Sequence, residues 1–436
     1  MRGLNIGHVL QLQQEVTGNV PPVTSTLVLT GAWDVNITER ASGFAEVKRE
    51  SGDVSVKSDG REIVGGIESL QMRAAFEGSR MRIDGGLATA RFGKVNAAGY
   101  VGLVQDNGFL TVSPQSTLAL RIQANIAQLD NISSVTGARV ALRGSANADL
   151  QVNGTLEKPV LAGNMIAENL ELTLYDQGIK LNKGVARLAI SNNKVELQEV
   201  VFHGGDGTLR ATGTIPLDQT NPALTATIVA DKLQLIADPS RQLTMSGTAL
   251  AANTGGQLKI SGEFTVDHAL FDLPEKSAPK LDDDVVILGP GAKQARDKNA
   301  PRPPPAHPGL LPPVVDVKLG LGNNFRFRGA GAALLLAGTL NIKSGPGQPP
   351  QGFGTVRVVN GVYEAFGAKL TIEQGILAFQ GPLDNPGLNI IAMRREREVE
   401  AGVQVTGNVR VPRIDLVSSP NLPEEEKLSW PGARPG

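Results

Sequence analysis

Apolar and polar residues alternate at every second position through most of the chain, and this period constrains the fold more than any other feature. Leu170, Leu172 and Leu174 alternate with Glu171 and Thr173. The same period recurs in residues 209–215, 258–266 and 403–411. Successive side chains of a β-strand point to opposite faces, so this period places the apolar residues on one face of each strand. The pattern predicts β-strands with one apolar and one polar face.

Glycine dipeptides interrupt the alternating stretches at short intervals. Such pairs favour tight turns, so they predict short strands joined by hairpins. Only residues 9–16 and 123–135 have a pattern compatible with a helix. We therefore predict an all-β chain with a mainly antiparallel or mixed sheet and under about a tenth of its residues in helices. The turn dipeptides are Asp59-Gly60, Gly85-Gly86, Asn107-Gly108, Asn153-Gly154, Gly204-Gly205, Asp206-Gly207, Gly255-Gly256 and Asn360-Gly361.

The composition favours an extended sheet over a thick globular core. Of 436 residues, 51 are Gly and 27 are Pro, while aromatic residues make up only 4%. Large cores usually depend on aromatic side chains, because each buries a large apolar area. The spacing Gly-x4-Pro-x-(Leu/Ile) also repeats, starting at Gly154, Gly381 and Gly407. Such repetition predicts an elongated, solenoid-like stack of short strands.

Two Pro-rich or Gly-rich segments interrupt the strand pattern. Pro274–Pro313 combines many prolines with the acidic run 282–284 and several basic residues. Proline cannot donate to a sheet and the charges resist burial, so we expect an exposed loop that leaves the sheet without ending it. Gly345–Gly354 is a shorter insertion of the same kind.

Several classes of function find no support in the sequence. The net charge of −1 provides no field to attract nucleic acid, and the absence of cysteine excludes disulfides and thiolate metal sites. The longest apolar stretch, Ala332–Ala337, is far shorter than the roughly 20 residues needed to cross a bilayer. Residues 1–5 precede no apolar run, so we expect no signal peptide.

No motif for catalysis, metal binding or cofactor binding stands out. The histidines at positions 8, 203, 268 and 307 are far apart and have no ligand or base at motif spacing. The glycine pairs at 320/322 and 329/331 lack the third glycine and the helix of a dinucleotide site. The acidic run 282–284 and the mixed charges of 394–398 are interpreted as solvated. We predict no catalytic residues, no metal and no cofactor.

The segment Gly361–Trp430 resembles the C-terminal domain of the TamB family. The similarity depends on the order and spacing of several short pieces rather than on any one of them. Gly31-Ala32-Trp33 and Arg49–Val54 resemble the region that precedes this domain in the family. The C-terminal pieces are Gly361–Gly367, Leu370–Ile372, Gly375–Phe379, Gly381–Leu388, Ala401–Gly407, Leu416–Pro420 and Leu428–Trp430.

The resemblance implies a fold and a function. TamB-like proteins are anchored in the inner membrane of diderm bacteria, and their periplasmic body is a folded-over β-sheet with an apolar groove. They work with TamA, a BamA-like outer-membrane barrel, in the insertion of outer-membrane proteins, and they are implicated in phospholipid passage between the two membranes. We therefore expect a non-enzymatic, periplasmic assembly and transport protein whose partners are a TamA-like barrel, phospholipid acyl chains and nascent outer-membrane proteins.

On this basis the chain divides into four segments. Residues 1–273 form a periplasmic β-groove segment, 274–313 the Pro-rich exposed loop, and 314–430 the C-terminal TamB-family domain. Residues 431–436 depart from the family pattern and are expected to be an aberrant tail. The inner-membrane anchor is expected to be absent from this chain.

Apolar residues of the alternating strands are the candidate lining of the groove. They could instead pack against one another, and the scarcity of aromatics together with the resemblance favours a groove. A dry, closed interior would favour a structural adhesin-like β-solenoid, and a cluster of three or more carboxylates would favour a carbohydrate-active β-helix enzyme. The candidate lining residues are Leu170, Leu172, Leu174, Leu188, Ile190, Ile260, Phe264, Val403 and Val405.

Overall fold

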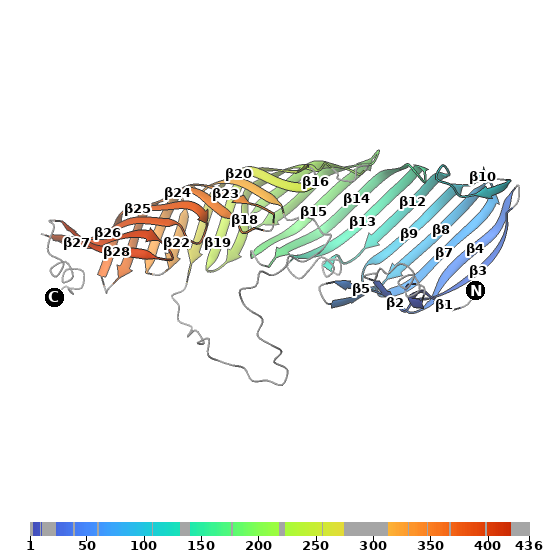
Figure 1. Cartoon of the computed structure of the whole chain (residues 1–436), viewed down its shortest axis with the longest axis horizontal. Helices are drawn as coiled ribbons and strands as arrows, with labels where there is room; N and C mark the ends of the chain where they lie inside the picture. Colours follow the sequence, from blue (N-terminus) through green and yellow to red (C-terminus); the bar gives the residue numbers. More distant parts are fainter. Residues whose placement is uncertain are drawn as a thin grey trace, which may run out of the picture. The chain divides into compact units, whose positions relative to one another are not determined.

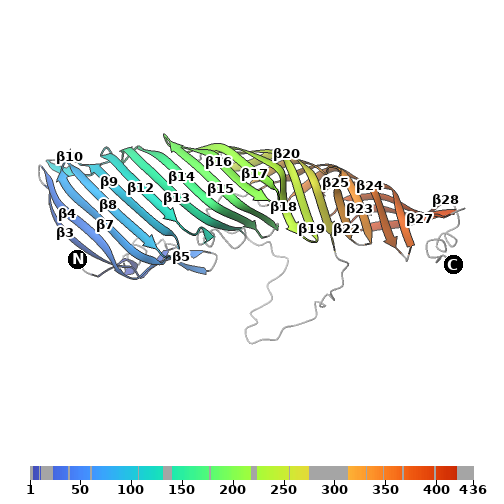
Figure 2. The ribbon, with the colours of Figure 1, turned by 180° about the vertical axis from the view of Figure 1, so that it is seen from behind.

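A computed structural model describes the chain in two units. The described residues are 3–8, 10, 23–37, 40–58, 61–106, 108–130, 140–175, 178–217, 223–254, 256–273, 313–329, 331–346, 348–365, 368–396 and 399–419. Unit 1 comprises Met1–Asp238 and Leu243–Gly255, and unit 2 comprises Pro239–Gln242 and Gly256–Gly436. Figures 1 and 2 show the ribbon from opposite sides. Helical geometry in the described residues is confined to positions 6–8, 10 and 130, which confirms the all-β prediction.

Unit 1 is built from antiparallel strands that follow one another in chain order (Figure 1). Its strands are β1 (Leu4–Asn5), β2 (Val23–Ser25), β3 (Val28–Ile37), β4 (Ala41–Ser51), β5 (Val54–Ser58), β6 (Arg61–Val64), β7 (Ile67–Gly78), β8 (Arg80–Thr89), β9 (Gly93–Gly102), β10 (Val104–Asp106), β11 (Phe109–Thr111), β12 (Thr117–Ile126), β13 (Val140–Thr155), β14 (Pro159–Leu174), β15 (Ile179–Ser191), β16 (Lys194–Gly204), β17 (Gly207–Pro216), β18 (Thr225–Asp238) and most of β19 (Arg241–Thr254).

Two small sheets branch from this series. β2, β5 and β6 form one, and the hairpin β10–β11 forms the other. Without them, the main sheet of unit 1 runs β1-β3-β4-β7-β8-β9-β12 and continues in chain order to β18. Because neighbours in sequence are neighbours in the sheet, the order of apolar faces along the chain becomes the order across the sheet.

The sheet of unit 1 curls in the region of β14 to β17. The pairing registers shift at bulges within β14, β15 and β16, and Asn169 and Lys183 adopt positive φ angles of 54° and 47° there. Bulges bend a strand and increase its twist. As a result β15 contacts β18, although β16 and β17 lie between them in the sheet.

Unit 2 begins with the only described parallel pairings of the chain. β20 (Gln257–Asp272) runs parallel to β21 (Val314–Gly320) and β22 (Phe325–Gly329). The following strands form an antiparallel meander. They are β23 (Ala332–Ser344), β24 (Gln351–Ala365), β25 (Ala368–Pro382), β26 (Gly387–Glu396), β27 (Val399–Asn408) and β28 (Pro412–Ser419).

The parallel register explains why a long connection is needed between β20 and β21. Lys259, near the start of β20, lies opposite Val314, whereas β20 ends at Asp272. The chain therefore returns along about 13 residues of strand, roughly 43 Å at 3.3 Å per residue, before β21 begins. The predicted Pro-rich loop supplies this crossover, and residues 274–312 of it lie outside the described residues. The register limits how far this loop can be shortened.

Some turn and helix predictions were wrong. Gly85-Gly86 and Asn360-Gly361 lie inside β8 and β24, and residues 123–126 of a predicted helix belong to β12. A β-carbon at Gly361 would lie 2.8 Å from Leu334 Cδ2, so this glycine permits close packing instead of a turn. Asn153-Gly154 lies at the end of β13, and the turn follows it at 156–158.

Other predictions lie partly beyond the described residues or were partly right. Gly205 and Asp206 form the hairpin turn between β16 and β17, as predicted. Most of the helical window 9–16, as well as Asp59-Gly60, lies outside the described residues. The insertion Gly345–Gly354 joins β23 to β24, but its residues 351–354 pair with β23 instead of forming a loop.

Candidate functional site: the apolar strand faces

Cross-strand register places apolar side chains of unit 1 in a continuous row. Directly opposite residues of an antiparallel pair point to the same face. Ile190 of β15, for example, lies opposite Gly163 of β14 and Val195 of β16. Followed from β3 to β17, this row contains only apolar residues and glycine. The row is Gly31, Val47, Met72, Gly85, Ala97, Ile122, Leu150, Gly163, Ile190, Val195 and Ile215.

The unit 1 candidates share this face. Leu188 lies opposite Met165 and Leu197. It is two residues from Ile190 on β15 and therefore points to the same face. Leu172 lies opposite Leu142 and Leu181, and Leu174 lies opposite Ile179. These candidates and Ile190 are half-buried. Sheet register therefore brings together residues that are far apart in the sequence.

Leu170 differs from the other unit 1 candidates because it is packed. It is 5% exposed and forms a cluster with Leu129, Ala146 and Ala167 inside the curl of the sheet. Phe202 packs against this cluster from β16. Leu170 is therefore part of a small packed core whose other members are not among the candidates.

The unit 2 candidates also share one face. Ile260 lies opposite Val315, and Phe264 lies opposite Leu319, which in turn faces Leu340 on β23. The same face continues through Val356, Leu377 and Leu388 to β26, where Ala392 and Ile390 lie opposite Val403 and Val405. Ile260, Phe264 and Val405 are half-buried, while Val403 is 2% exposed.

Two clusters fill part of the unit 2 face. Leu321, Leu336, Leu340 and Val356 form one, and Leu370, Ala392 and Val403 form the other. Aromatic residues that the prediction did not single out join them. Phe325, Phe327 and Phe379 pack on the first cluster and Tyr363 on the second. These four aromatic residues therefore contribute to the apolar face of unit 2, which the composition alone could not show.

Parts of both faces are open among the described residues. Met72 in the unit 1 row is 57% exposed, and Trp33 on the same face is 61% exposed. In unit 2, Ile414 lies opposite Val405 and is 54% exposed. A large apolar surface left exposed is typical of a ligand-binding or partner-binding surface.

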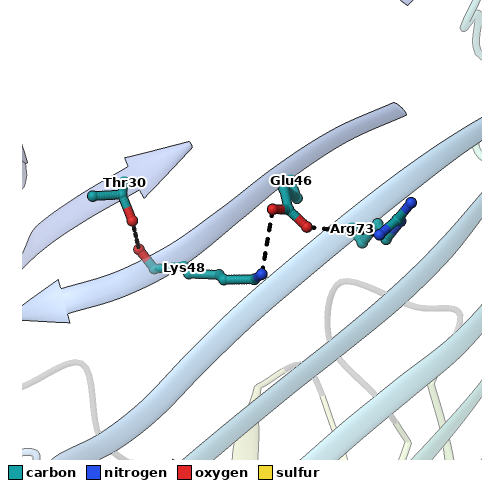
Figure 3. A network of polar contacts seen from close by, with 4 residues as sticks. All are labelled: Thr30, Glu46, Lys48 and Arg73. Atoms are coloured by element: carbon teal, nitrogen blue, oxygen red, sulfur yellow. Dashed lines mark hydrogen bonds and ion pairs between the residues drawn. The ribbon is translucent and has the colours of Figure 1, made fainter. Parts of the chain in front are cut away.

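The opposite face of unit 1 is polar and carries ion pairs between neighbouring strands. Glu46 lies between Lys48 and Arg73, at 3.3 and 3.7 Å, and Thr30 donates a hydrogen bond to the backbone carbonyl of Lys48 (Figure 3). Arg121 pairs with Asp149 farther along this face, and Arg187 pairs with Glu199. Exposed pairs contribute little stability individually, typically about 0–1 kcal/mol. Their charged groups make this face of the sheet suited to contact with water.

The segment Arg49–Val54 forms a structural corner between β4 and β5. The Asp53 carboxylate accepts hydrogen bonds from the backbone N–H groups of Val54, Gly66 and Ile67 at 2.7, 2.9 and 3.2 Å. Arg49 donates to the carbonyl of Gly52 at 3.0 Å. These interactions hold the β5–β6 excursion against the main sheet, so the residues that carried the upstream resemblance have a structural role here.

A second corner joins two hairpins of unit 2. Arg410, between β27 and β28, pairs with Asp384 at 2.6 Å, and the backbone N–H of Arg410 donates to the Asn385 side chain at 3.0 Å. The hydrogen bond from Arg410 lowers the pKa of Asp384 below its ordinary value, and partial desolvation opposes it. Asp384 and Asn385 belong to the segment Gly381–Leu388 that carried the family resemblance.

Replacing Arg410 by glutamine should raise the pKa of Asp384 towards the ordinary value of an aspartate. Because the pKa is lowered in the folded state, the stabilisation is present above the unfolded-state pKa of about 3.9 and is lost as the pH falls through the folded-state pKa. NMR titration of the Asp384 carboxyl carbon measures this directly. Arg413→Gln, which removes the pair with Asp415, is the matched control and should leave Asp384 unchanged. An Asp384 pKa that does not rise in Arg410→Gln would contradict this account.

The described residues show no constellation for metal chemistry. They contain no group of three or more His, Cys, Asp or Glu side chains placed to hold a metal ion. His203 contacts the carbonyl of Lys183 at 3.3 Å, and His268 contacts the Asn324 side chain at 2.9 Å. His307 lies outside the described residues. Within the described part of the chain, no helix is long and apolar enough to span a bilayer.

Comparison with known proteins identifies the family. The model of the TamB C-terminal domain matches residues 198–430. The chain belongs to the TamB family. It is also 25% identical over 302 residues to the translocation and assembly module subunit TamB of Haemophilus influenzae. That alignment covers 66% of this chain and 23% of the relative, so the chain spans about a quarter of the length of the TamB protein it matches.

The TamB match includes strands of both units. It starts within β16 of unit 1 and extends beyond β28 of unit 2, well upstream of the Gly361–Trp430 segment on which the resemblance was based. Val403 and Val405 lie inside the matched region, as do Ile260 and Phe264. The candidates on β14 and β15 lie upstream of it.

Proposed function

We propose that this TamB-family chain is a periplasmic part of a translocation and assembly module, and that its apolar strand faces bind phospholipid acyl chains during passage between the inner and outer membranes. The observation that supports this most strongly is the uninterrupted apolar row from β3 to β17, with Met72 more than half exposed. A face that is apolar across many strands and only partly filled by its own side chains offers an acyl chain a surface away from water.

The proposal includes the partners implied by the family. A TamA-like outer-membrane barrel of the BamA family would bind the C-terminal end of the protein. Nascent outer-membrane proteins would be the cargo for insertion. The full-length parent would be anchored in the inner membrane. The proposed role involves binding and guidance and no covalent chemistry.

A charge on an apolar face is expected to abolish lipid contact. Leu172→Asp and Val405→Arg each place an ion at a half-buried position where an acyl chain would lie, an environment that is unfavourable for an unpaired charge by several kcal/mol. A photo-crosslinking amino acid at Leu188 or Ile390 should label phospholipid in the parent chain. Leu172→Asp should abolish the labelling at Leu188, and Val405→Arg should abolish the labelling at Ile390. In a full-length protein, the same substitutions should fail to rescue an envelope defect.

The neighbouring residues provide matched controls. Thr173→Asp and Gln404→Arg place the same charges one residue away, on the opposite face of the same strands. They should retain crosslinking and rescue. If folded Leu172→Asp and Val405→Arg proteins kept both activities, the apolar faces would be ordinary core and the proposal would be wrong.

A further inference from the structure

The polar face of unit 1 contains an unusual group of amide side chains. Where β9, β12, β13 and β14 lie side by side, the register aligns the outward residues in rows across the four strands. We name this group the amide patch. Its two central rows are Lys94, Asn125, Asn147 and Ile166, and Asn96, Gln123, Asp149 and Asn164.

The residue types of the amide patch are unfavourable for strands. Asn and Asp are depleted in β-strands, and host-protein scales span about 1 kcal/mol between good and poor strand formers. The polar face of β17 and β18 in the same sheet is an example of a solvated face built from threonine. There, Thr212 and Thr214 lie opposite Thr227 and Thr225. The amide patch therefore uses residues that weaken the strands where threonine would serve solubility equally well.

The patch surrounds a shallow concavity of about 490 Å³, which Lys94, Gln123, Asp149 and Asn164 help to line. Asn125 donates to Asn147 at 2.6 Å, and Gln123 donates to Asp149 at 3.3 Å. Asn96 and Asn164, at the two ends of one row, make no side-chain hydrogen bond to another described residue. Donors and acceptors are thus held in place around the concavity with capacity left for a ligand.

The charge of the patch is small. Arg121 pairs with Asp149, which leaves Lys94 as the remaining ionised side chain of the two central rows. Such a surface attracts neither a polyanion nor an acyl chain. Tyr100 lies on the same face of β9, is 40% exposed and has the Arg80 guanidinium 5.1 Å from its ring centre. It lies two rows from Asn96 along β9 and adds an aromatic side chain to this face.

We propose that the amide patch binds a glycan whose sugars carry hydroxyl and acetamido groups. A side-chain amide offers both donors and an acceptor, which matches hydroxyl groups and pairs reciprocally with an acetamido group. Within a row, neighbouring side chains are one strand spacing apart, about 4.8 Å. An extended chain of sugars that follows the second row across the strands therefore meets Asn96, Gln123, Asp149 and Asn164 in turn, three amides and one carboxylate. The patch lies on the opposite face from the proposed acyl-chain surface, so the two activities are independent.

The test uses a β-1,4-linked tetramer of N-acetylglucosamine titrated into the chain. Two-dimensional NMR should show chemical-shift changes confined to β9, β12, β13 and β14. The double variant Asn147→Thr/Asn164→Thr should weaken binding by at least about tenfold, because it removes two amides from the concavity. Its melting temperature should stay the same or rise, because threonine favours strands. A glucose tetramer, which lacks acetamido groups, should bind more weakly.

Controls separate this proposal from the proposed lipid function. Thr212→Asn/Thr227→Asn, which adds amides elsewhere on the polar face, should leave glycan affinity unchanged. The Asn147→Thr/Asn164→Thr protein should also keep phospholipid crosslinking at Leu188. No shift changes at saturating tetramer, or equal affinity of the parent and the folded double variant, would overturn the glycan proposal and leave the lipid proposal intact.

Discussion

Replacing Val403 by aspartate should destabilise unit 2 by about 3–5 kcal/mol, as expected for an unpaired charge in a packed interior. Val403 is 2% exposed and packs in a cluster with Leu370 and Ala392, each 1% exposed. Its opposite neighbours, Ala392 and Leu416, provide no hydrogen-bond partner from their side chains. The free energy of unfolding, measured in urea by circular dichroism, should fall accordingly.

The pH dependence of this variant identifies the cause. Burial should raise the pKa of the new carboxyl above its unfolded value, so the carboxyl is neutral in both states at low pH. As the pH rises through the unfolded-state pKa of about 3.9, only the unfolded chain ionises, and stability falls by about 1.4 kcal/mol per pH unit until the folded-state pKa is reached. The variant should therefore lose stability, relative to the parent, between about pH 4 and 7.

Two controls accompany Val403→Asp. Val403→Thr keeps the shape and adds a hydroxyl without a charge, so its cost should be smaller. Val405→Asp places the same carboxylate on the same face at a half-buried position, where water can reach it. If Val405→Asp were as costly as Val403→Asp, the distinction between packed and open parts of this face would be wrong.

Adding a β-carbon at Gly184 should destabilise unit 1 by about 1–3 kcal/mol, the usual effect of overpacking. Gly184 is a buried residue of β15 that lies opposite Leu170. A β-carbon there would lie 2.5 Å from Phe202 Cε1 and 2.7 Å from Leu170 Cβ. Gly184→Ala tests whether the cluster in the curl of the sheet is tightly packed, with urea unfolding as the measurement and hydrogen exchange of β14–β16 to localise the effect.

A double variant distinguishes crowding from other effects of this substitution. Phe202→Leu alone should be destabilising because it leaves a cavity, whereas Gly184→Ala/Phe202→Leu should recover part of the loss, because the alanine methyl occupies space that the ring vacates. Gly85→Ala is the matched control, since its nearest contact would be Gln71 O at 3.7 Å. Additive effects of the two substitutions would contradict the proposed contact.

The apolar faces could be predicted from sequence because alternation is a local property. Leu170, Leu172 and Leu174 share a face through their spacing alone, as do Ile260 and Phe264, and the register agrees with both groups. The family could also be recognised locally, because its short pieces keep their order and spacing. The roles of Asp53 and Asp384 needed the structure, since each binds backbone or side chains from another hairpin.

Alternation could not show which candidates are packed and which are open. Leu170 and Leu172 have the same pattern in sequence, but the curl of the sheet buries Leu170 beneath Phe202 and leaves Leu172 half-exposed. Likewise, Gly85-Gly86 resembles a turn in sequence and is a strand in the structure. Bulges and close glycine contacts depend on the neighbouring strand, which a local pattern does not contain.

The β-strand pattern and the two faces of each strand could be read from the amino-acid sequence, because alternation is set by near neighbours in the chain, and the family from the order of its short pieces. The strand register, the parallel pairing of β20 with β21, the curl from β14 to β17 and the amide patch are known only from the folded chain. These features arise where strands that are separate in sequence meet. Asn96, Gln123, Asp149 and Asn164 form one row only because hydrogen bonds between backbones set four separate strands in register.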